Sequence, residues 1–235
     1  MKPKKRKVAV FDIDGTVFRS SLLIELTEML IADKVFPAEA RRVYTRAYSR
    51  WLERRDPYGK YINAVIRAFE RYIRGVREKD FVKVVDKVAA FHRNRVYRYT
   101  RDLIKELKRK GYYLLAISHS PKYVVEKFAK QMGFHKVYGR ILEMDNQGRF
   151  TGQTSFIEFI FDKSKIFARA AEKENLTLRG SVGVGDTESD IKFLEMVERP
   201  ICFNPNQVLY QAARRRGWPV VVERKDVVYD IKTKR

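Results

Sequence analysis

The stretch KVAVFDIDGT (7–16) decides the fold of this chain. It opens with a short β-branched and apolar run that ends at acidic residues, which predicts a buried strand. Residues two apart on an extended chain point the same way, so we expect Asp12 and Asp14 to face one site while Ile13 turns to the core. Gly15 then allows the chain to leave the strand sharply. The sequence therefore predicts a site at the carboxyl end of this strand, where open α/β sheets bind their ligands.

Two patterns follow this strand along the chain. Residues 20–96 carry apolar side chains at helical spacing with Gly and Pro at the joints, which predicts a block of about three to five helices. From residue 100, helices alternate with short apolar strands, which predicts a parallel sheet with right-handed crossovers and helices on both faces. Strands are expected at 112–118, 181–185, 201–203 and 219–222, a hairpin at 137–153, and helices at 163–174, 189–197 and 207–216. The fold class is therefore α/β, with the helical block inserted after the first strand.

Composition and charge limit the kinds of protein that the chain can be. Its 235 residues (27.8 kDa) suit one large domain or a core with an inserted unit, and 45% apolar residues exclude general disorder. No apolar run approaches the ~18 residues that span a bilayer, no secretory signal opens the chain, and the single Cys202 favours a reducing compartment. We therefore expect a cytoplasmic protein. The 50 Lys and Arg outnumber the 29 Asp and Glu, and the resulting net charge of +21 attracts polyanions or anionic substrates.

Two further strand ends carry polar residues that can join the aspartates of the first strand. The second strand ends at Ser118, and Ser120-Pro121 is interpreted as the N-cap and first residue of a helix, whose N-terminus favours a phosphate. The segment GDTESD (185–190) places Asp186 in a loop and Asp190 in the first turn of a helix. Carboxylates that converge on one pocket repel one another unless a hard cation lies between them, and Mg²⁺ is the natural choice.

Four motifs thus follow one another along the chain: FDIDGT (11–16), AISHS (116–120), Lys163 in FDKSK (161–165) and GDTESD (185–190). In this order they resemble the motifs of the haloacid dehalogenase superfamily, in its branch of phosphoserine-phosphatase-like hydrolases (subfamily IB). The resemblance spans nearly the whole chain. It implies a Rossmann-like core formed by residues 1–16 and 99–235. It also implies an inserted all-helical cap of type C1, residues 17–98, that acts as a mobile lid.

The resemblance also assigns catalytic roles. Asp12 would attack phosphorus and form an aspartyl-phosphate, while Asp14 would protonate the leaving oxygen and then deprotonate the attacking water. Ser118 and nearby backbone N–H groups would hold the phosphoryl oxygens. Lys163 would offset the charge of the nucleophile and the phosphate, with Lys165 as the rival for that role.

The same resemblance implies a magnesium site. Mg²⁺ would be held by Asp12, the backbone carbonyl of Asp14 and Asp186, with Asp190 as a further ligand or as support for the others. We therefore expect a Mg²⁺-dependent phosphatase that hydrolyses a small phosphomonoester. An acid at position 14 suits phosphate-ester chemistry, because a halide leaving group needs no proton.

The sequence leaves the substrate open. Phosphoserine-specific relatives carry a glutamate where this chain has Ser21, although Glu25, one helical turn later, could replace it. His119 is a candidate for contact with the substrate, with the alternative that only its backbone contributes. The segment RRVYTRAYSRWLERR (41–55) is typical of an amphipathic helix with its aromatic residues inward. It also fits a protein that binds nucleic acid or phospholipid, or that removes phosphate from nucleic-acid ends. For a metabolite phosphatase, nucleic acid should bind only nonspecifically at low salt.

Overall fold

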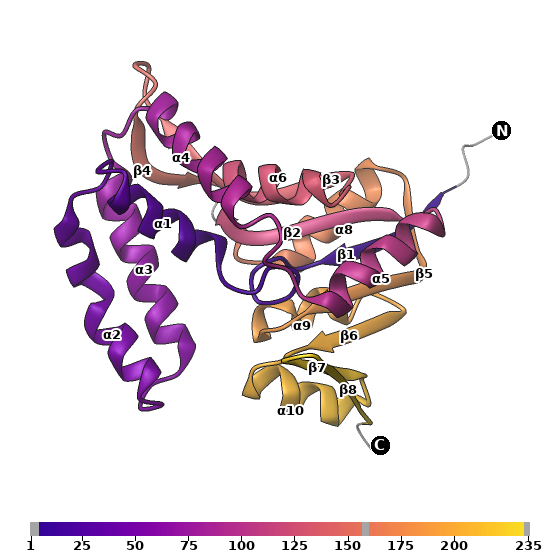
Figure 1. Cartoon of the computed structure of the whole chain (residues 1–235). Helices are drawn as coiled ribbons and strands as arrows, with labels where there is room; N and C mark the ends of the chain where they lie inside the picture. The colour runs from indigo at the N-terminus through magenta and orange to yellow at the C-terminus, as the bar shows by residue number, and fades with distance from the viewer. Residues whose placement is uncertain (1–4, 157–159, 233–235) are drawn as a thin grey trace.

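The computed structural model describes residues 5–156 and 160–232, and one twisted sheet forms its centre (Figure 1). In these residues the sheet has eight strands in the order β4-β3-β2-β1-β5-β6-β7-β8. The strands are β1 (Arg6–Phe11), β2 (Tyr113–Pro121), β3 (Lys136–Met144), β4 (Phe150–Ser155), β5 (Leu176–Gly185), β6 (Arg199–Phe203), β7 (Val220–Arg224) and β8 (Val227–Ile231). The six central strands run parallel, and β4 and β8 are antiparallel edges. The predicted parallel α/β sheet is confirmed.

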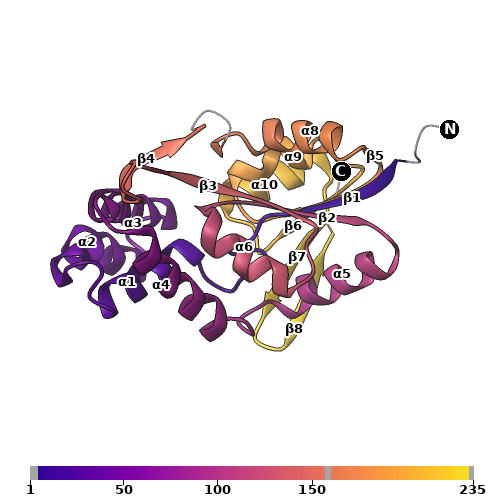
Figure 2. The same cartoon turned by 90° about the horizontal axis from the view of Figure 1, so that it is seen from above.

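The central strand β1 shows why helices cover both faces of the sheet. Its residues Ala9 and Phe11 are fully buried in the apolar cluster on one face, and Val8 and Val10 are fully buried in the cluster on the other. Helices α5 (Arg98–Arg109) and α6 (Lys122–Gln131) lie on the first face, and α8 (Lys163–Lys173), α9 (Ile191–Leu194) and α10 (Gln207–Arg216) on the second (Figure 2). A strand with apolar residues on both sides therefore requires the three-layer arrangement.

The helical block predicted after the first strand is present. Between β1 and α5 the chain forms α1 (Leu22–Ala32), the short 3-10 helix η1 (Ala38–Arg41), α2 (Arg42–Leu52), α3 (Tyr58–Ile73) and α4 (Glu78–Phe91). Their apolar stripes, which include Leu26, Phe69 and Val88, join the buried cluster on one face of the sheet. In Figure 1 these helices stand beyond the carboxyl end of β1. No helix in the described ranges is long and apolar enough to cross a membrane.

The predicted hairpin, formed by β3 and β4, reaches from the sheet to the inserted helices. The N–H of Gly75 donates to the carbonyl of Phe150 (2.8 Å), and the N–H of Phe150 donates to the carbonyl of Val76 (3.0 Å). The buried guanidinium of Arg140 in β3 contacts the Glu70 carboxylate of α3 at 2.8 Å. The helical block is therefore joined to the sheet by the hairpin as well as by its own chain connections.

Several elements differ from the predicted ones; strand β5, for example, begins at Leu176 rather than at residue 181. Strand β2 continues through Pro121, so Ser120 lies in the strand and is not the N-cap of α6. Its hydroxyl donates instead to the carboxylate of Asp14. The helix expected over 189–197 is divided into a 3-10 turn, η2 (Glu188–Asp190), and the short α9. Strand β8 was not predicted, since most of its side chains are exposed and show no alternation of buried and exposed residues.

The basic and aromatic segment 41–55 forms the short helix α2 and its flanks. Its Tyr44 is buried, and Trp51 stacks on Tyr61 of α3 with ring centroids 5.4 Å apart and planes at 16°. These aromatic side chains pack against one another and the neighbouring helix, which favours the interpretation of an amphipathic helix over that of a stacking platform for nucleic acid.

Candidate active site

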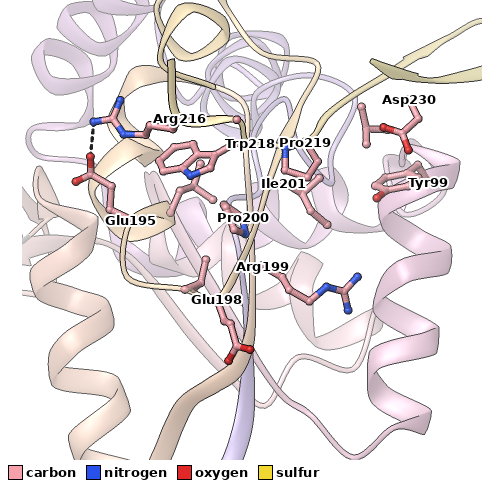
Figure 3. Close-up of a pocket in the computed structure, with 14 residues that line it drawn as sticks. Tyr99, Glu195, Glu198, Arg199, Pro200, Ile201, Arg216, Trp218, Pro219 and Asp230 are labelled. Carbon is pink, nitrogen blue, oxygen red and sulfur yellow. Dashed lines mark hydrogen bonds and ion pairs between the residues drawn. The ribbon is translucent and has the colours of Figure 1, made fainter. Parts of the chain in front are cut away.

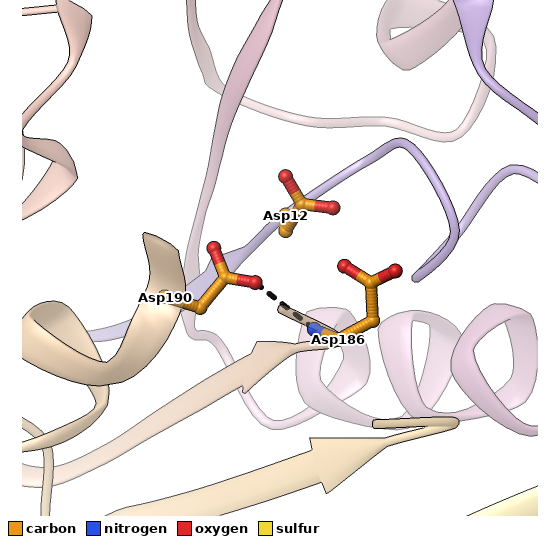
Figure 4. Close-up of side chains that lie close together, drawn as sticks. All are labelled: Asp12, Asp186 and Asp190. Carbon is orange, nitrogen blue, oxygen red and sulfur yellow. Dashed lines mark hydrogen bonds between the residues drawn. The ribbon is translucent and has the colours of Figure 1, made fainter. Parts of the chain in front are cut away.

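The carboxyl edge of the sheet gathers the carboxylates that the motifs predicted. Asp12 follows β1, Asp186 follows β5 and Asp190 ends the turn η2. Figure 4 shows their carboxylates close together, and one oxygen of each lies within 4.8 Å of the others. Two glycines allow this approach: a Cβ on Gly15 would lie 2.1 Å from Oδ2 of Asp186, and a Cβ on Gly185 would lie 2.5 Å from Cβ of Asp190.

Lys163 is the cation of this cluster. It is the first residue of α8 and only 3% exposed, and its Nζ donates to Oδ1 of Asp12 (2.5 Å) and Oδ1 of Asp190 (2.6 Å). Burial alone would lower the pKa of the lysine, but the charges of the two aspartates raise it above its usual value, so the ammonium stays charged. The rival candidate Lys165 is exposed. The structure therefore brings Lys163, and not Lys165, into the site.

Asp190 organises the loop after β5. Its Oδ2 accepts hydrogen bonds from the N–H groups of Asp186 (2.9 Å) and Thr187 (3.0 Å), while its Oδ1 accepts from Lys163. Both oxygens of Asp190 are thus occupied by donors of the chain. This arrangement favours the second of the two predicted roles, in which Asp190 positions the loop and the lysine rather than binding a cation directly.

The negative charges of Asp12 and Asp186 are offset less fully by donors of the chain than the charge of Asp190. Oδ2 of Asp12 is buried and has no hydrogen-bond partner among the described residues. Burial raises the pKa of Asp12 to about 7, with the charges of Asp190 and Asp14 adding to the effect and Lys163 opposing it. Burial, followed by the charges of Asp12 and Asp190, also raises the pKa of Asp186 well above its usual value. The buried Asp12 carboxylate and the half-buried Asp186 carboxylate, whose negative charges Lys163 alone does not neutralise, suit a hard divalent cation, so the residues present fit Mg²⁺.

Asp14 is held by donors from two elements. Its Oδ1 accepts from the N–H of Leu22 (2.5 Å), and its Oδ2 accepts from the hydroxyls of Ser118 (2.5 Å) and Ser120 (2.9 Å). Burial raises the pKa of this carboxyl, although the three hydrogen bonds oppose the shift. Sequence reasoning missed Ser120, but a signal existed: residues 118 and 120 are two apart on a strand and point to the same side.

His119, between these serines, alternates to the other side of β2. Its ring lies 6.0 Å from that of Phe161, and it forms a hydrogen bond with the backbone of Ile160. Burial, with Lys163 next, lowers the pKa of the imidazole to about 3, so His119 is neutral. Its Nε2 is buried without a partner in the described residues. Contact between His119 and the substrate stays a prediction.

A cavity of about 800 Å³ lies away from this edge, at the amino ends of β6 and β7 (Figure 3). Arg199, Trp218 and Asp230 are among the residues that line it, and Arg216 contacts Glu195 on its wall. None of the motif residues lines this cavity. It is therefore separate from the candidate active site.

These features define a class of protein. The site combines paired aspartates after a central parallel strand, a carboxylate after the neighbouring strand, and a buried lysine. Such a site suits an anionic group together with a hard cation. The family model described as haloacid dehalogenase-like hydrolase matches residues 9–195, most of the chain. The chain belongs to this family.

Comparison with known proteins also supports the predicted branch of the family. The chain is 25% identical over 213 residues to a phosphoserine phosphatase of Archaeoglobus fulgidus, a match that covers 89% of this chain and 56% of that protein. Its fold is similar to that of a protein of unknown function from Bordetella pertussis Tohama I (TM-score 0.73, 20% identity, 92% and 98% of the two chains). It is also similar to a phospho-aspartyl intermediate analogue of phosphoserine phosphatase (TM-score 0.63, 19% identity, 95% and 96% of the two chains). The chain is therefore a hydrolase of the phosphoserine-phosphatase-like branch.

Proposed function

We propose that the chain is a Mg²⁺-dependent phosphatase that hydrolyses a small phosphomonoester through an aspartyl-phosphate on Asp12. The observation that carries the proposal is the state of the Asp12 carboxylate. Lys163 holds its Oδ1, while its buried Oδ2 has no partner among the described residues. A buried oxygen that is oriented but unpaired is suited to attack phosphorus. The family match and the phosphatases among the relatives support phosphate-ester chemistry.

The chemistry proceeds in two steps. In the first, Oδ2 of Asp12 forms a bond to phosphorus as the ester bond breaks, and the alcohol oxygen takes a proton from Asp14. In the second, Asp14 removes a proton from water, whose oxygen attacks phosphorus and releases inorganic phosphate and the free Asp12 carboxylate. The raised pKa of Asp14 suits the first step, because it keeps a proton available for transfer.

Other groups of this chain support both steps. Lys163 keeps its charge beside the nucleophile and offsets the negative charge brought by the phosphoryl group. Ser118 donates to a phosphoryl oxygen. Asp12, the backbone carbonyl of Asp14 and Asp186 would hold Mg²⁺, which when bound neutralises part of the phosphoryl charge. In this proposal residues 17–98 form the cap over a core of residues 1–16 and 99–235.

The test is replacement of the nucleophile. Asp12→Asn should abolish Mg²⁺-dependent hydrolysis of p-nitrophenyl phosphate while circular dichroism shows a folded protein. Asp102→Asn, at an aspartate of α5 whose side chain is 53% exposed, is the matched control and should keep wild-type turnover. EDTA should abolish the activity of the wild type, and added Mg²⁺ should restore that activity. Near-wild-type turnover by Asp12→Asn, or full activity without a divalent cation, contradicts the proposal.

Nucleic-acid binding is measured in the same series. Counterion release makes binding to a protein of net charge +21 fall steeply with salt. For a metabolite phosphatase, RNA and DNA should dissociate near physiological salt while ester hydrolysis persists. Tight binding at that salt with no hydrolysis of any small ester would instead favour a polyanion-binding protein.

A further inference from the structure

A second cavity, of about 550 Å³, lies where the inserted helices meet the hairpin. It is lined by the chain after α1, by the end of α3 and the turn that leads into α4, and by Arg149 just before β4. The last two of these segments are joined, because the N–H of Glu78 donates to the carbonyl of Gly148 (3.0 Å) and Arg77 pairs with Arg149 as an isolated antiparallel bridge (Figure 1). None of the motif residues lines this cavity, so it is separate from the candidate active site.

The lining of this cavity is strongly cationic. Among the described residues it holds five basic side chains and one acid: Lys34, Arg71, Arg74, Arg77, Arg149 and Asp80. Basic residues are thus five of the eleven that line it, whereas they are 50 of the 235 residues of the chain. The larger cavity at the amino ends of β6 and β7 is different, since its described lining contains two arginines and three acidic residues. The basic lining is therefore a local feature and not only a result of the net charge. We call this space the basic cavity.

The positive charge of the basic cavity is not neutralised by the chain. Four cations of its lining form no ion pair with a described residue: Lys34, Arg71, Arg74 and Arg149. Asp80 does not offset their charge, because Arg77 contacts its carboxylate at 2.7 Å and Lys83 lies 3.5 Å from it.

Two acids beside this lining in the sequence belong to other contacts. Asp33, which precedes Lys34, lies 2.6 Å from Nζ of Lys87 in α4. Glu70 of α3 lies 2.8 Å from the buried guanidinium of Arg140. Neither acid lines the basic cavity, and each is already paired with a cation. Four positive charges therefore surround one space without a counter-charge from the described chain, and an anionic ligand would relieve their mutual repulsion.

Two of the four cations are held in place by backbone carbonyls. Nε of Arg74 donates to the carbonyl of Thr151 (3.1 Å), and a terminal nitrogen of Arg149 donates to the carbonyl of Gly75 (3.1 Å). A guanidinium has five N–H donors, so most of them remain available to a ligand. These hydrogen bonds position the two groups without neutralising them, which reduces the entropy lost when an anion binds.

We propose that the basic cavity binds a polyphosphate chain, either free or as part of a nucleoside triphosphate. A single phosphate carries about two negative charges and offsets only half of the four cations, whereas three linked phosphates carry enough charge for all of them. Guanidinium groups also match the geometry of phosphate oxygens. The cations come from three separate segments and surround one cavity, and they do not form a stripe such as a nucleic-acid strand would follow. This site is independent of the proposed phosphatase activity.

Isothermal titration calorimetry in EDTA at physiological salt tests the proposal, because it measures binding without metal-dependent turnover. Tripolyphosphate should bind the wild type at one site per chain. Orthophosphate should bind at least about tenfold more weakly, since it forms fewer charge-assisted hydrogen bonds. A lower Kd for ATP than for tripolyphosphate identifies a nucleoside triphosphate as the ligand, and an equal or higher Kd for ATP identifies free polyphosphate.

Two pairs of substitutions locate the binding. The double variant Lys34→Gln/Arg71→Gln removes two exposed cations of the cavity and should raise the Kd for tripolyphosphate by about tenfold. Arg71→Gln alone should raise it by about threefold, which keeps the test available if the double variant unfolds. The matched control Lys105→Gln/Arg109→Gln also removes one lysine and one arginine. Both are exposed on α5, which lies well apart from the hairpin in Figures 1 and 2, and the Kd should stay within about twofold of the wild type.

Three results would overturn the proposal. The first is that neither tripolyphosphate nor ATP binds the wild type at physiological salt. The second is that the cavity variants bind as the wild type does, or that the control variant loses as much affinity as the cavity variants, because the ligand then lies elsewhere or responds only to the net charge. The third is that a single-stranded oligonucleotide of thymidines binds more tightly than tripolyphosphate and loses affinity in the same cavity variants, because the partner is then nucleic acid.

Discussion

Replacing Gly15 by alanine should disable the active site and leave the protein folded. The new Cβ would lie 2.1 Å from Oδ2 of Asp186 and 3.0 Å from its Cγ. The carboxylate must therefore withdraw by about 1 Å, and a displacement of that size in a catalytic site costs about 100-fold in rate. Gly15 also has a φ of +80°, which costs an alanine about 1 kcal/mol. For a chain of this size, that strain lowers Tm by about 2–4 °C.

A second glycine serves as a control that has the backbone strain of Gly15 but does not displace Asp186. Gly111, which follows α5, has a φ of +76°, and a Cβ there would meet no atom within 4 Å. Gly111→Ala should therefore lose the same few degrees of Tm as Gly15→Ala and keep its activity. The assay is kcat/KM for p-nitrophenyl phosphate across a Mg²⁺ titration, with Tm from circular dichroism. If Gly15→Ala stays within about threefold of Gly111→Ala in kcat/KM at every Mg²⁺ concentration, the steric role of Gly15 is refuted.

Lys163→Met should lower kcat by about 10²–10³ at saturating Mg²⁺, because the charge beside Asp12 is lost, and a loss of less than tenfold in steady-state kinetics would contradict the assigned role. The raised pKa values of Asp12 (about 7) and Asp186 mean that the folded metal-free protein binds protons that the unfolded chain releases. The metal-free protein should therefore lose stability as pH rises toward and past 7, and Mg²⁺ should raise Tm more at pH 8 than at pH 5.5; equal increases in melting experiments would exclude this linkage. Ser118→Ala should move the alkaline limb of the pH profile of kcat/KM to higher pH and leave the alkaline limb of kcat in place. If the alkaline limbs of kcat/KM and kcat both move, or if neither moves, Asp14 is not the proton donor.

The parts of the fold that follow from local pattern could be predicted from the sequence. Strand β1 is a short apolar run with a clear end, and its paired aspartates are close in sequence, so their common direction follows from strand geometry. The alternation of helices and strands after residue 100 predicted the parallel sheet and its helical layers. The exposed edge strand β8 has no such pattern, and its pairing with β7 depends on the finished sheet.

The parts of the site that depend on tertiary contacts could not be predicted. A serine followed by proline is a common start of a helix, yet Ser120 remains in β2 because its hydroxyl donates to Asp14. Likewise, the sequence could not show that Arg95 and His92 occupy Glu25.

The resting hydrogen bonds of Asp14 connect substrate binding to proton transfer. The Ser118 hydroxyl has one proton, and in the free enzyme that proton is donated to Oδ2 of Asp14, where it favours the charged carboxylate. In the proposed complex the same hydroxyl donates to a phosphoryl oxygen instead. Asp14 then loses a hydrogen bond that lowered its pKa at the same time as a further negative charge arrives, and both changes favour the protonated acid. Ser120 and the N–H of Leu22 still hold the carboxyl in place. The pair Ser118–Asp14 thus makes the proton available when the leaving oxygen needs it. This coupling explains why removal of Ser118 should raise the pKa of Asp14 in the free enzyme and leave that pKa unchanged in the complex.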